Sequence, residues 1–470
     1  MFISRPLSPR RLPHHVRVFL PSILLVSCAS LDPQPDIETA AALASSRTDT
    51  ATREPWNQPV DTPSTAWNGH DPLHADVALA VAIQNNPHLR LELATIAQRR
   101  ADFVQAGLLP NPTIGFSIGV AVDGLSGAPA LVQGLQTLTW LWTQPDRIAI
   151  ADATLQSAIL TAAEHAVTLA EEVGIAHAAV LAADELHTLE TAYRKIATST
   201  LRLIQARLNA GEAAALDVDR AEVDMQSSRT ACIKSLRSLE QKKLTLLKAM
   251  GWPGHTLRWS AAEPSAAMRP ATDSDHALLE LAASQHLALA SHAAIIEQHI
   301  ASYALATTKK LPEVQFTFGW QRNFRDRQAV MPGARITIPL FDDGSPAIAK
   351  ANAQLEMSRL QWIATANQIE YNVRDTASRW RQASAQAVIT ANNLVPSATS
   401  ALRRSQSSYA EGVIDLTVLL LAQEQLIAAE RTFVLQRLAE NTALIQLRRA
   451  VGGTFRTLAT PLVASQGDDS

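Results

Sequence analysis

The sequence is poor in the residues that stabilise compact globular cores. Only two of its 470 residues are cysteine, and aromatic residues make up 5% of the chain although apolar residues make up 47%. The apolar content is therefore mostly alanine and leucine, which favour helices. This composition is typical of long helices that pack as coiled coils, and not of a core rich in aromatic rings.

Long apolar runs are missing too. No uninterrupted run of eighteen or more apolar residues is present, so the sequence predicts no membrane-spanning helix. A chain without such a helix can cross a bilayer only as a closed β-barrel, because lipid offers no partners for unpaired backbone groups.

Motifs for catalysis or metal binding are also absent. No HExxH, CxxC, GxSxG, Walker or GxGxxG pattern occurs in its required context. The 13 histidines are scattered, and the pair His286 and His292 is six residues apart, off one helical face. We therefore expect no enzyme, no metal site and no cofactor.

The first 27 residues have the pattern of a lipoprotein signal peptide. Four arginines precede a short apolar segment over residues 18–26, and Leu25-Val26-Ser27-Cys28 fits a bacterial lipobox. We predict that Cys28 is acylated and anchors the protein to outer-membrane lipid; the alternative is an ordinary thiol near the N-terminus. The second cysteine, Cys232, then has no disulfide partner and is expected to be a small packing residue.

Removal of residues 1–27 leaves 37 basic and 44 acidic residues, a formal charge of −7 with histidine neutral. This balance argues against nucleic acid as a partner. Residues 28–72 are rich in Pro, Asp, Thr and Ser without a sustained period, and they are predicted to be an extended, acylated tether.

The remaining chain contains one pattern twice, about 200 residues apart. Leu109-Pro110 is matched by Leu311-Pro312 at an offset of 202, and Ala249-Met250-Gly251 is matched by Ala450-Val451-Gly452 at 201. A fixed offset of this length indicates a duplicated structural unit. The predicted division is a signal peptide over 1–27, the tether over 28–72, repeat one over 73–252, a linker over 253–270, repeat two over 271–454 and a polar tail over 455–470.

Each repeat contains a short segment with a period of two. In repeat one, large apolar residues at 114, 116, 118, 120 and 122 alternate with small ones, and in repeat two Val314, Phe316, Phe318 and Trp320 alternate with small or polar residues. This alternation suits a strand with lipid on one side and water on the other. Return strands are expected at 131–142 and 330–340, with Trp140 and Trp142 on one face as an aromatic girdle.

Helical patterns fill most of each repeat. A first helix is expected from His74, broken at Pro87, and helices of about 60 residues are expected after Pro145 and Pro346. Leu186, Leu189, Tyr193, Ile196, Thr200 and Leu203 form a heptad seam. Pro396 should kink the second long helix. Gly211 and Gly412 end the long helices, and an antiparallel helix follows each.

Three segments carry a resemblance to the TolC-like outer-membrane factor family, over residues 73–454. They are residues 86–112, from Asn86-Pro87-His88-Leu89 to Leu109-Pro110-Asn111-Pro112; Ile338-Pro339-Leu340-Phe341-Asp342-Asp343-Gly344; and Tyr409-Ala410-Glu411-Gly412-Val413-Ile414-Asp415. The resemblance implies a mainly α fold with a small β part. In it, duplicated long coiled-coil helices and two β-hairpins form a trimeric β-barrel continued by an α-helical barrel.

The resemblance also implies a function and its partners. A homotrimer would conduct substrate passively across the outer membrane as the channel of a tripartite efflux pump, with a periplasmic adaptor protein and an inner-membrane efflux transporter. Heavy-metal cations and drugs are both possible substrates. The alternative is a periplasmic coiled-coil scaffold without a pore, for which the alternating apolar segments would have no use.

Site residues follow from the same resemblance. The adaptor would dock at the helix reversals, whose matching positions are Arg207, Leu208, Gly211, Tyr409 and Gly412. The periplasmic gate of the family often carries aspartate rings, which Asp217 matches in repeat one. Repeat two departs from this pattern with Val418 and Leu421, although Asp415 lies nearby. The constriction is therefore either acidic or apolar, and the glycines are required by the turns in either case.

Overall fold

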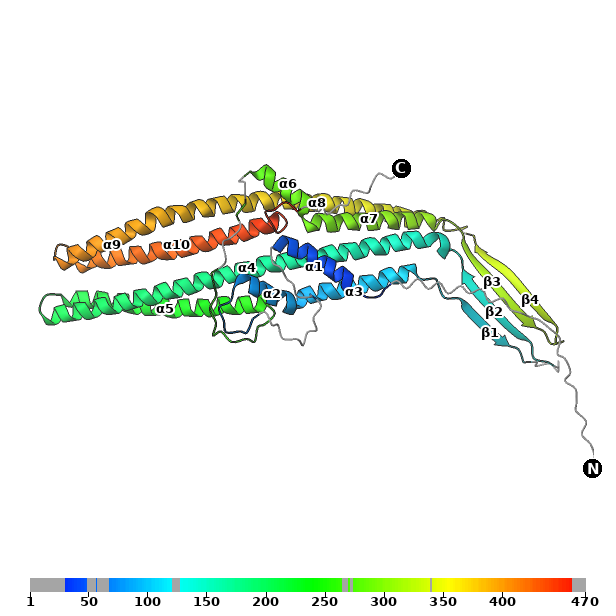
Figure 1. Ribbon diagram of the computed structural model, residues 1–470, viewed down its shortest axis with the longest axis horizontal. Coiled ribbons are helices and arrows are strands. Elements are labelled where there is room, and N and C mark those ends of the chain that lie inside the picture. Colours follow the sequence, from blue (N-terminus) through cyan, green and yellow to red (C-terminus); the bar gives the residue numbers. More distant parts are fainter. Residues whose placement is uncertain are drawn as a thin grey trace, which may run out of the picture.

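The protein is an elongated bundle of long helices with a small sheet at one end, as the computed structural model shows (Figure 1). The structure describes residues 30–48, 56, 67–120, 127–263, 269–270, 274–338 and 340–458. Cys28 and most of the expected turn at 123–127 lie outside the described residues.

Both repeats have the same order of elements. Repeat one contains α2 (Ala75–Asn85), α3 (Pro87–Gly107), β1 (Thr113–Ile118), β2 (Ala130–Thr137), α4 (Trp140–Asn209) and α5 (Ala215–Ala249). Repeat two contains α6 (Asp275–Gln285), α7 (Leu287–Thr308), β3 (Glu313–Arg322), β4 (Gln328–Thr337), α8 (Ser345–Ile389), the π-helix η1 (Thr390–Leu394), α9 (Val395–Ala410) and α10 (Leu416–Ala450). A further helix, α1 (Gln34–Thr48), precedes them.

Prolines interrupt the helices where the sequence predicts it. Pro87 begins α3, and the Asn86 side chain caps that helix by accepting from the backbone N–H of His88 and Leu89. In repeat two, η1 directly precedes Pro396, whose missing N–H removes one helical hydrogen bond. Both predicted interruptions are confirmed.

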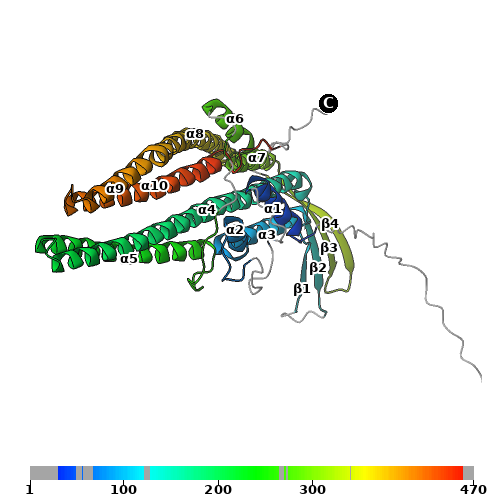
Figure 2. The same ribbon diagram turned by 60° about the vertical axis from the view of Figure 1, so that its left-hand side comes forward.

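The sheet is antiparallel with the order β1-β2-β3-β4, so hairpins from both repeats join in one sheet. Within a single chain β1 and β4 are edge strands. Figure 2 shows the sheet bending away from the axis of the helices. The opposite end of the molecule holds the two helix reversals, α4 to α5 and α9 to α10 (Figure 1).

Alanine and leucine form the core, in agreement with the composition. The largest buried cluster joins α1 to α5, and separate clusters lie between α6, α8 and α10 and at the helix reversals. Small side chains let the helix axes approach closely over their whole length, which explains how the chain folds with so few aromatic residues.

Three expectations need correction. The extended tether over 28–72 is wrong for α1, which is helical and buries Ile37, Ala40 and Ala44 against the core. Trp140 and Trp142 belong to the first turn of α4 and not to a strand face. The long helix α4 begins at Trp140, so Pro145 lies inside the helix, where its missing N–H removes one intrahelical hydrogen bond.

One helix of the described part, α4, is long and apolar enough to cross a membrane by length and composition. Its best eighteen-residue window has a mean hydropathy of 1.4, and 50% of that window is buried inside the protein. A search for uninterrupted apolar runs does not find α4, because polar residues interrupt its sequence. The mean hydropathy of a window tolerates such residues. Core helices pass the same test, and α4 contacts α3, α5, α7 and α10.

Candidate channel wall and periplasmic tip

The sheet has one apolar face that nothing in the subunit covers. Ile114, Phe116 and Ile118 of β1 are 74%, 67% and 59% exposed, and Phe316 and Phe318 of β3 are about half exposed. An exposed apolar face of this extent is typical of a surface that contacts lipid or another protein.

The strand register places the apolar residues of all four strands together. Phe116 pairs with Val132, Val132 with Trp320, and Trp320 with Val330. Directly paired residues share a face of the sheet, so this row crosses the sheet from edge to edge. The alternation predicted within each strand is confirmed, and the register brings the apolar residues of both repeats onto one face.

The other face is mostly polar. Gln315 pairs with Arg335, and Thr317 pairs with Gly333. Ser117 of β1 shares this face through Leu131 and Gln321. The sheet is therefore amphipathic in the way that a wall between lipid and water requires.

The helix reversals at the other end are built alike. Gly211 has φ +80° and Gly412 has φ +74°, a conformation that other residues rarely adopt. The N–H of Gly211 donates to the Leu208 carbonyl at 3.0 Å, and the N–H of Glu212 donates to the Arg207 carbonyl at 2.8 Å. Equivalent bonds close the second turn at 3.1 and 2.9 Å, so both are Schellman turns.

The predicted tip residues of the two repeats meet. The Arg207 guanidinium lies 4.9 Å from the ring centroid of Tyr409, within the range of a cation–π interaction. Beside them a groove of about 650 Å³ runs between α4 and α9. Ile196 and Leu203 of the predicted heptad seam line it and are about half exposed.

The predicted gate aspartates both cap helices. The N–H of Ala214, the N-cap of α5, donates to an Asp217 carboxylate oxygen at 3.2 Å. Asp415, the N-cap of α10, accepts from the backbone N–H of Val418 at 3.1 Å. These bonds are the two halves of a capping box, one in each repeat. The capping bonds do not show whether either aspartate also forms part of a gate, so the gating role stays a prediction.

The apolar residues of the predicted gate point outward. Val418 and Leu421 are 44% and 52% exposed, whereas Leu416 and Leu419 are buried in the core of the tip. The four side chains thus divide between a packing face and a free face of α10. An apolar constriction formed by the free faces of several subunits stays a prediction.

An ion pair that the sequence did not predict joins the repeats above the tip. Arg431 of α10 binds both oxygens of Glu190 of α4, at 2.5 and 2.7 Å, and Glu190 is only 8% exposed. Nearby, the hydroxyl of Tyr193 donates to Asp224 at 2.8 Å. Glu190 and Arg431 are 241 residues apart, so only the folded chain brings them together.

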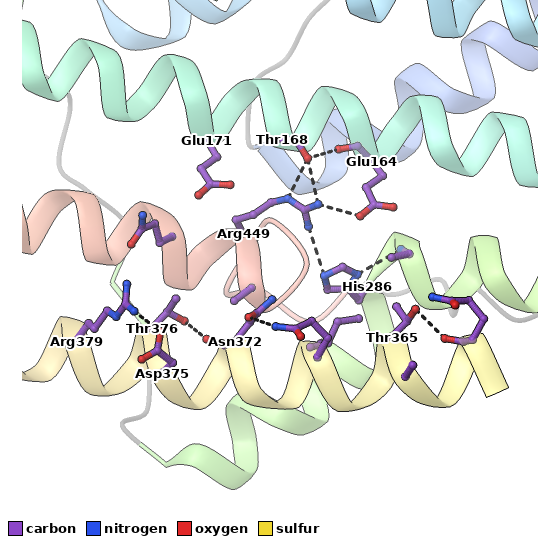
Figure 3. A pocket seen from close by; sticks show the side chains of 17 residues that line it. Glu164, Thr168, Glu171, His286, Thr365, Asn372, Asp375, Thr376, Arg379 and Arg449 are labelled. Carbon is purple, nitrogen blue, oxygen red and sulfur yellow. Dashed lines mark hydrogen bonds and ion pairs between the residues drawn. The ribbon is translucent and has the colours of Figure 1, made fainter. Parts of the chain in front are cut away.

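A polar pocket occupies the middle of the molecule, where α10 ends and α7 begins, between α4 and α8 (Figure 3). Arg449 donates to Glu164 at 2.9 Å and to the hydroxyl of Thr168 at 3.1 Å, and it lies 3.4 Å from His286 Nε2. Burial, and then the charges of Arg449 and Arg47, lower the pKa of His286 to about 3, so its ring is neutral.

The family follows from comparison with known proteins. A sequence profile described as "Outer membrane efflux protein" matches residues 78–252 and 278–453, three quarters of the chain. The protein belongs to the outer membrane efflux protein family. The two matched segments lie in the two repeats, and the family consists of transport channels rather than enzymes. The protein is thus an outer-membrane channel for efflux.

Individual relatives agree with this assignment. The cobalt-zinc-cadmium resistance protein CzcC of Cupriavidus metallidurans is 21% identical over 371 residues, which cover 76% of this chain and 85% of CzcC. The outer-membrane channel OprN has a TM-score of 0.71 at 16% identity, covering 89% of this chain and 96% of OprN. The outer membrane protein VceC of Vibrio cholerae has a TM-score of 0.69 at 17% identity, covering 81% and 97%.

Proposed function

We propose that three copies of the protein form a passive outlet duct of a tripartite efflux pump and that its cargo is heavy-metal cations. Cys28 carries the lipid anchor in the outer membrane, and the helices extend into the periplasm. A periplasmic adaptor docks at the tip and connects the duct to an inner-membrane transporter, which supplies the energy.

The amphipathic, four-stranded sheet with two open edges carries this proposal. The edge strands β1 and β4 present unpaired backbone groups, and lipid cannot satisfy them. Four strands are too few to enclose water, since small barrels need about eight. Three copies that pair β4 of one with β1 of the next give twelve strands, no edge and an apolar outer surface.

The helices support the same assembly. Exposed apolar side chains follow α5 and α8 along their length, including Val223 and Ile233 on α5 and Met357 and Leu360 on α8. Stripes of this kind are covered when coiled-coil helices of neighbouring subunits pack together. The tip residues, with open space around Gly211 and Gly412, support the docking of an adaptor backbone.

The cargo is proposed from one relative. CzcC is named for resistance to cobalt, zinc and cadmium, and it resembles this chain over most of both lengths. Drugs are the alternative cargo. Deletion of the gene, followed by growth on a panel of metal salts and drugs, separates them. We expect lost tolerance to divalent metals; lost tolerance to drugs alone would overturn the metal assignment.

The pore itself is tested on the purified protein. We expect a trimeric mass in detergent, heat-modifiable migration in gels and conductance in planar bilayers. A scaffold built from the same coiled coils would give no conductance. A stable monomer without conductance would contradict the duct, since a single sheet cannot close.

A further inference from the structure

A channel wall does not by itself require the polar pocket in the middle of the molecule. Its volume is about 730 Å³. It is lined mainly by charged and amide side chains from four helices, α4, α7, α8 and α10. The side chains that carry charge or can do so are Glu164, Glu171, His286, Asp375, Arg379 and Arg449.

One of these charged side chains has no partner of opposite charge among the described residues. Glu164 pairs with Arg449 at 2.9 Å, and Asp375 pairs with Arg379 at 2.8 Å. Glu171 has neither a hydrogen bond nor an ion pair with any described residue, although it lines the pocket (Figure 3). With His286 neutral, the side chains that line the pocket carry one more negative charge than positive charges, and Arg47, whose charge reaches His286, lies outside this lining.

Burial raises the pKa of Glu171, while the attraction of Arg449 opposes this effect. A carboxylate in this position gains from a cation that arrives from solution. No group of three or more His, Cys, Asp or Glu side chains in the described part is placed to hold a metal ion. Any cation in the pocket would therefore keep most of its water shell.

The duplication argues that the pocket is not required by the fold. At the equivalent junction of repeat one, Asn86 caps α3 and its Nδ2 donates to the Ala249 carbonyl at 3.1 Å, which joins the helix ends directly. In repeat two Gln285 joins the helix ends, since its Nε2 donates to the Val451 carbonyl at 3.1 Å, and His286 takes the place of Asn86 as the N-cap. Arg449 turns inward to it, whereas Lys248, 201 positions earlier, is exposed.

The pocket lies on a different side of α4 from the side that contacts α1 and α2. Ala163, Ala166 and Ala170 are buried in the core on the side where α1 and α2 contact α4. Helix geometry places Glu164 and Glu171 roughly 110 to 130° around the axis from the mean direction of these alanines. In the proposed trimer we place α1 and α2 on the outer surface, so that the pocket side of α4 turns toward the tunnel.

We infer that the pocket is a weak resting site for a hydrated divalent metal cation on the tunnel wall, with Glu171 as the group that attracts it. The inference rests on the proposed function. A hydrated ion with six waters needs roughly 200 Å³, so it fits with solvent around it. Weak binding suits conduction, since a site on a transport path must release what it binds.

The test compares E171Q with E172Q in planar bilayers. Glu172 is the exposed neighbour on α4 and does not line the pocket, so E172Q is a matched control for charge. The cobalt-to-chloride permeability ratio is obtained from reversal potentials across a CoCl₂ gradient. We expect E171Q to lower this ratio about threefold to tenfold, as loss of one nearby charge predicts, and E172Q to change it less than twofold.

Equilibrium dialysis of the detergent-solubilised protein against CoCl₂ provides a second measurement that needs no conductance. Wild-type protein and E172Q should retain more cobalt than E171Q does. Equal permeability ratios and equal retention for the three proteins would overturn the resting site while leaving the duct intact. A wild-type protein that conducts nothing would instead contradict the proposed function, and dialysis would still decide whether Glu171 attracts cobalt.

Discussion

His286 makes the protein sensitive to acid, and replacement by asparagine should remove that sensitivity. The ring is 6% exposed, and burial together with Arg449 and Arg47 lowers its pKa to about 3. An unfolded chain binds a proton at His286 below about pH 6.5, but the folded chain does not. The unfolded state then binds more protons, so the stability from this site is present above pH 6.5 and is lost as the pH falls toward 3.

The magnitude follows from the two pKa values. At pH 5 the free energy of unfolding is about 2 kcal/mol per subunit lower than at pH 7, and it falls by about 1.4 kcal/mol more for each further pH unit toward pH 3. H286N keeps a capping side chain, as Asn86 does at the equivalent position, but it cannot titrate. It should therefore destabilise the protein little at pH 7 and flatten the dependence below pH 6.5.

Hydrogen exchange of the α6–α7 junction, measured at pH 7 and pH 5 and corrected for intrinsic rates, reports this difference locally. H276N is the control, because His276 is exposed and, among the described residues, pairs with Glu280 alone, at 3.5 Å. We expect the control to follow the wild type at both pH values. An H286N protein that loses protection in acid as steeply as the wild type would refute the argument that burial keeps this ring neutral.

Three further substitutions test the helix reversal at the tip, the two faces of the sheet and the ion pair between Glu190 and Arg431. G211A should cost about 1 to 2 kcal/mol, because φ is positive while a Cβ would meet nothing within 4 Å, and exchange at the tip measures it. F318R on the apolar face should prevent heat-modifiable trimers, at a cost of about 2 to 4 kcal/mol, whereas T317R on the polar face should assemble and lower conductance. R431M leaves the buried carboxylate of Glu190 unpaired and should cost about 3 kcal/mol in thermal unfolding.

Local patterns in the sequence predict most of the architecture. The proline interruptions, the glycine turns and the two faces of the sheet each depend on a few neighbouring residues, and they agree with the structure. The period of two around Phe316 sufficed to assign the apolar face. The joining of both hairpins in one sheet was expected only through the family resemblance.

What the sequence did not predict depends on contacts between distant segments. Helix α1 has a weak amphipathic pattern, and its position is fixed by partners such as Arg100, which binds both oxygens of Asp36 at 2.6 Å. The sequence pattern extends the return strand to Trp140 and Trp142 as an aromatic girdle, but in the structure α4 begins at Trp140 and includes both residues. No local pattern in the sequence predicts the ion pair between Glu190 and Arg431.

The two repeats share one order of elements, apart from the π-helix in repeat two, while their side-chain chemistry differs at the tip and at the middle of the molecule. At the tip, one repeat caps its return helix from Asp217 and the other from Asp415, three positions apart in the common frame. At the middle, Asn86 donates to the Ala249 carbonyl in one repeat, whereas in the other Gln285 donates to the Val451 carbonyl and His286 lies against Arg449. Three-fold symmetry would repeat each difference around the tunnel, so alternate hairpins would not be equivalent. Models of gating and conduction for this protein should therefore treat the tunnel as three pairs of unlike walls and not as six equal ones.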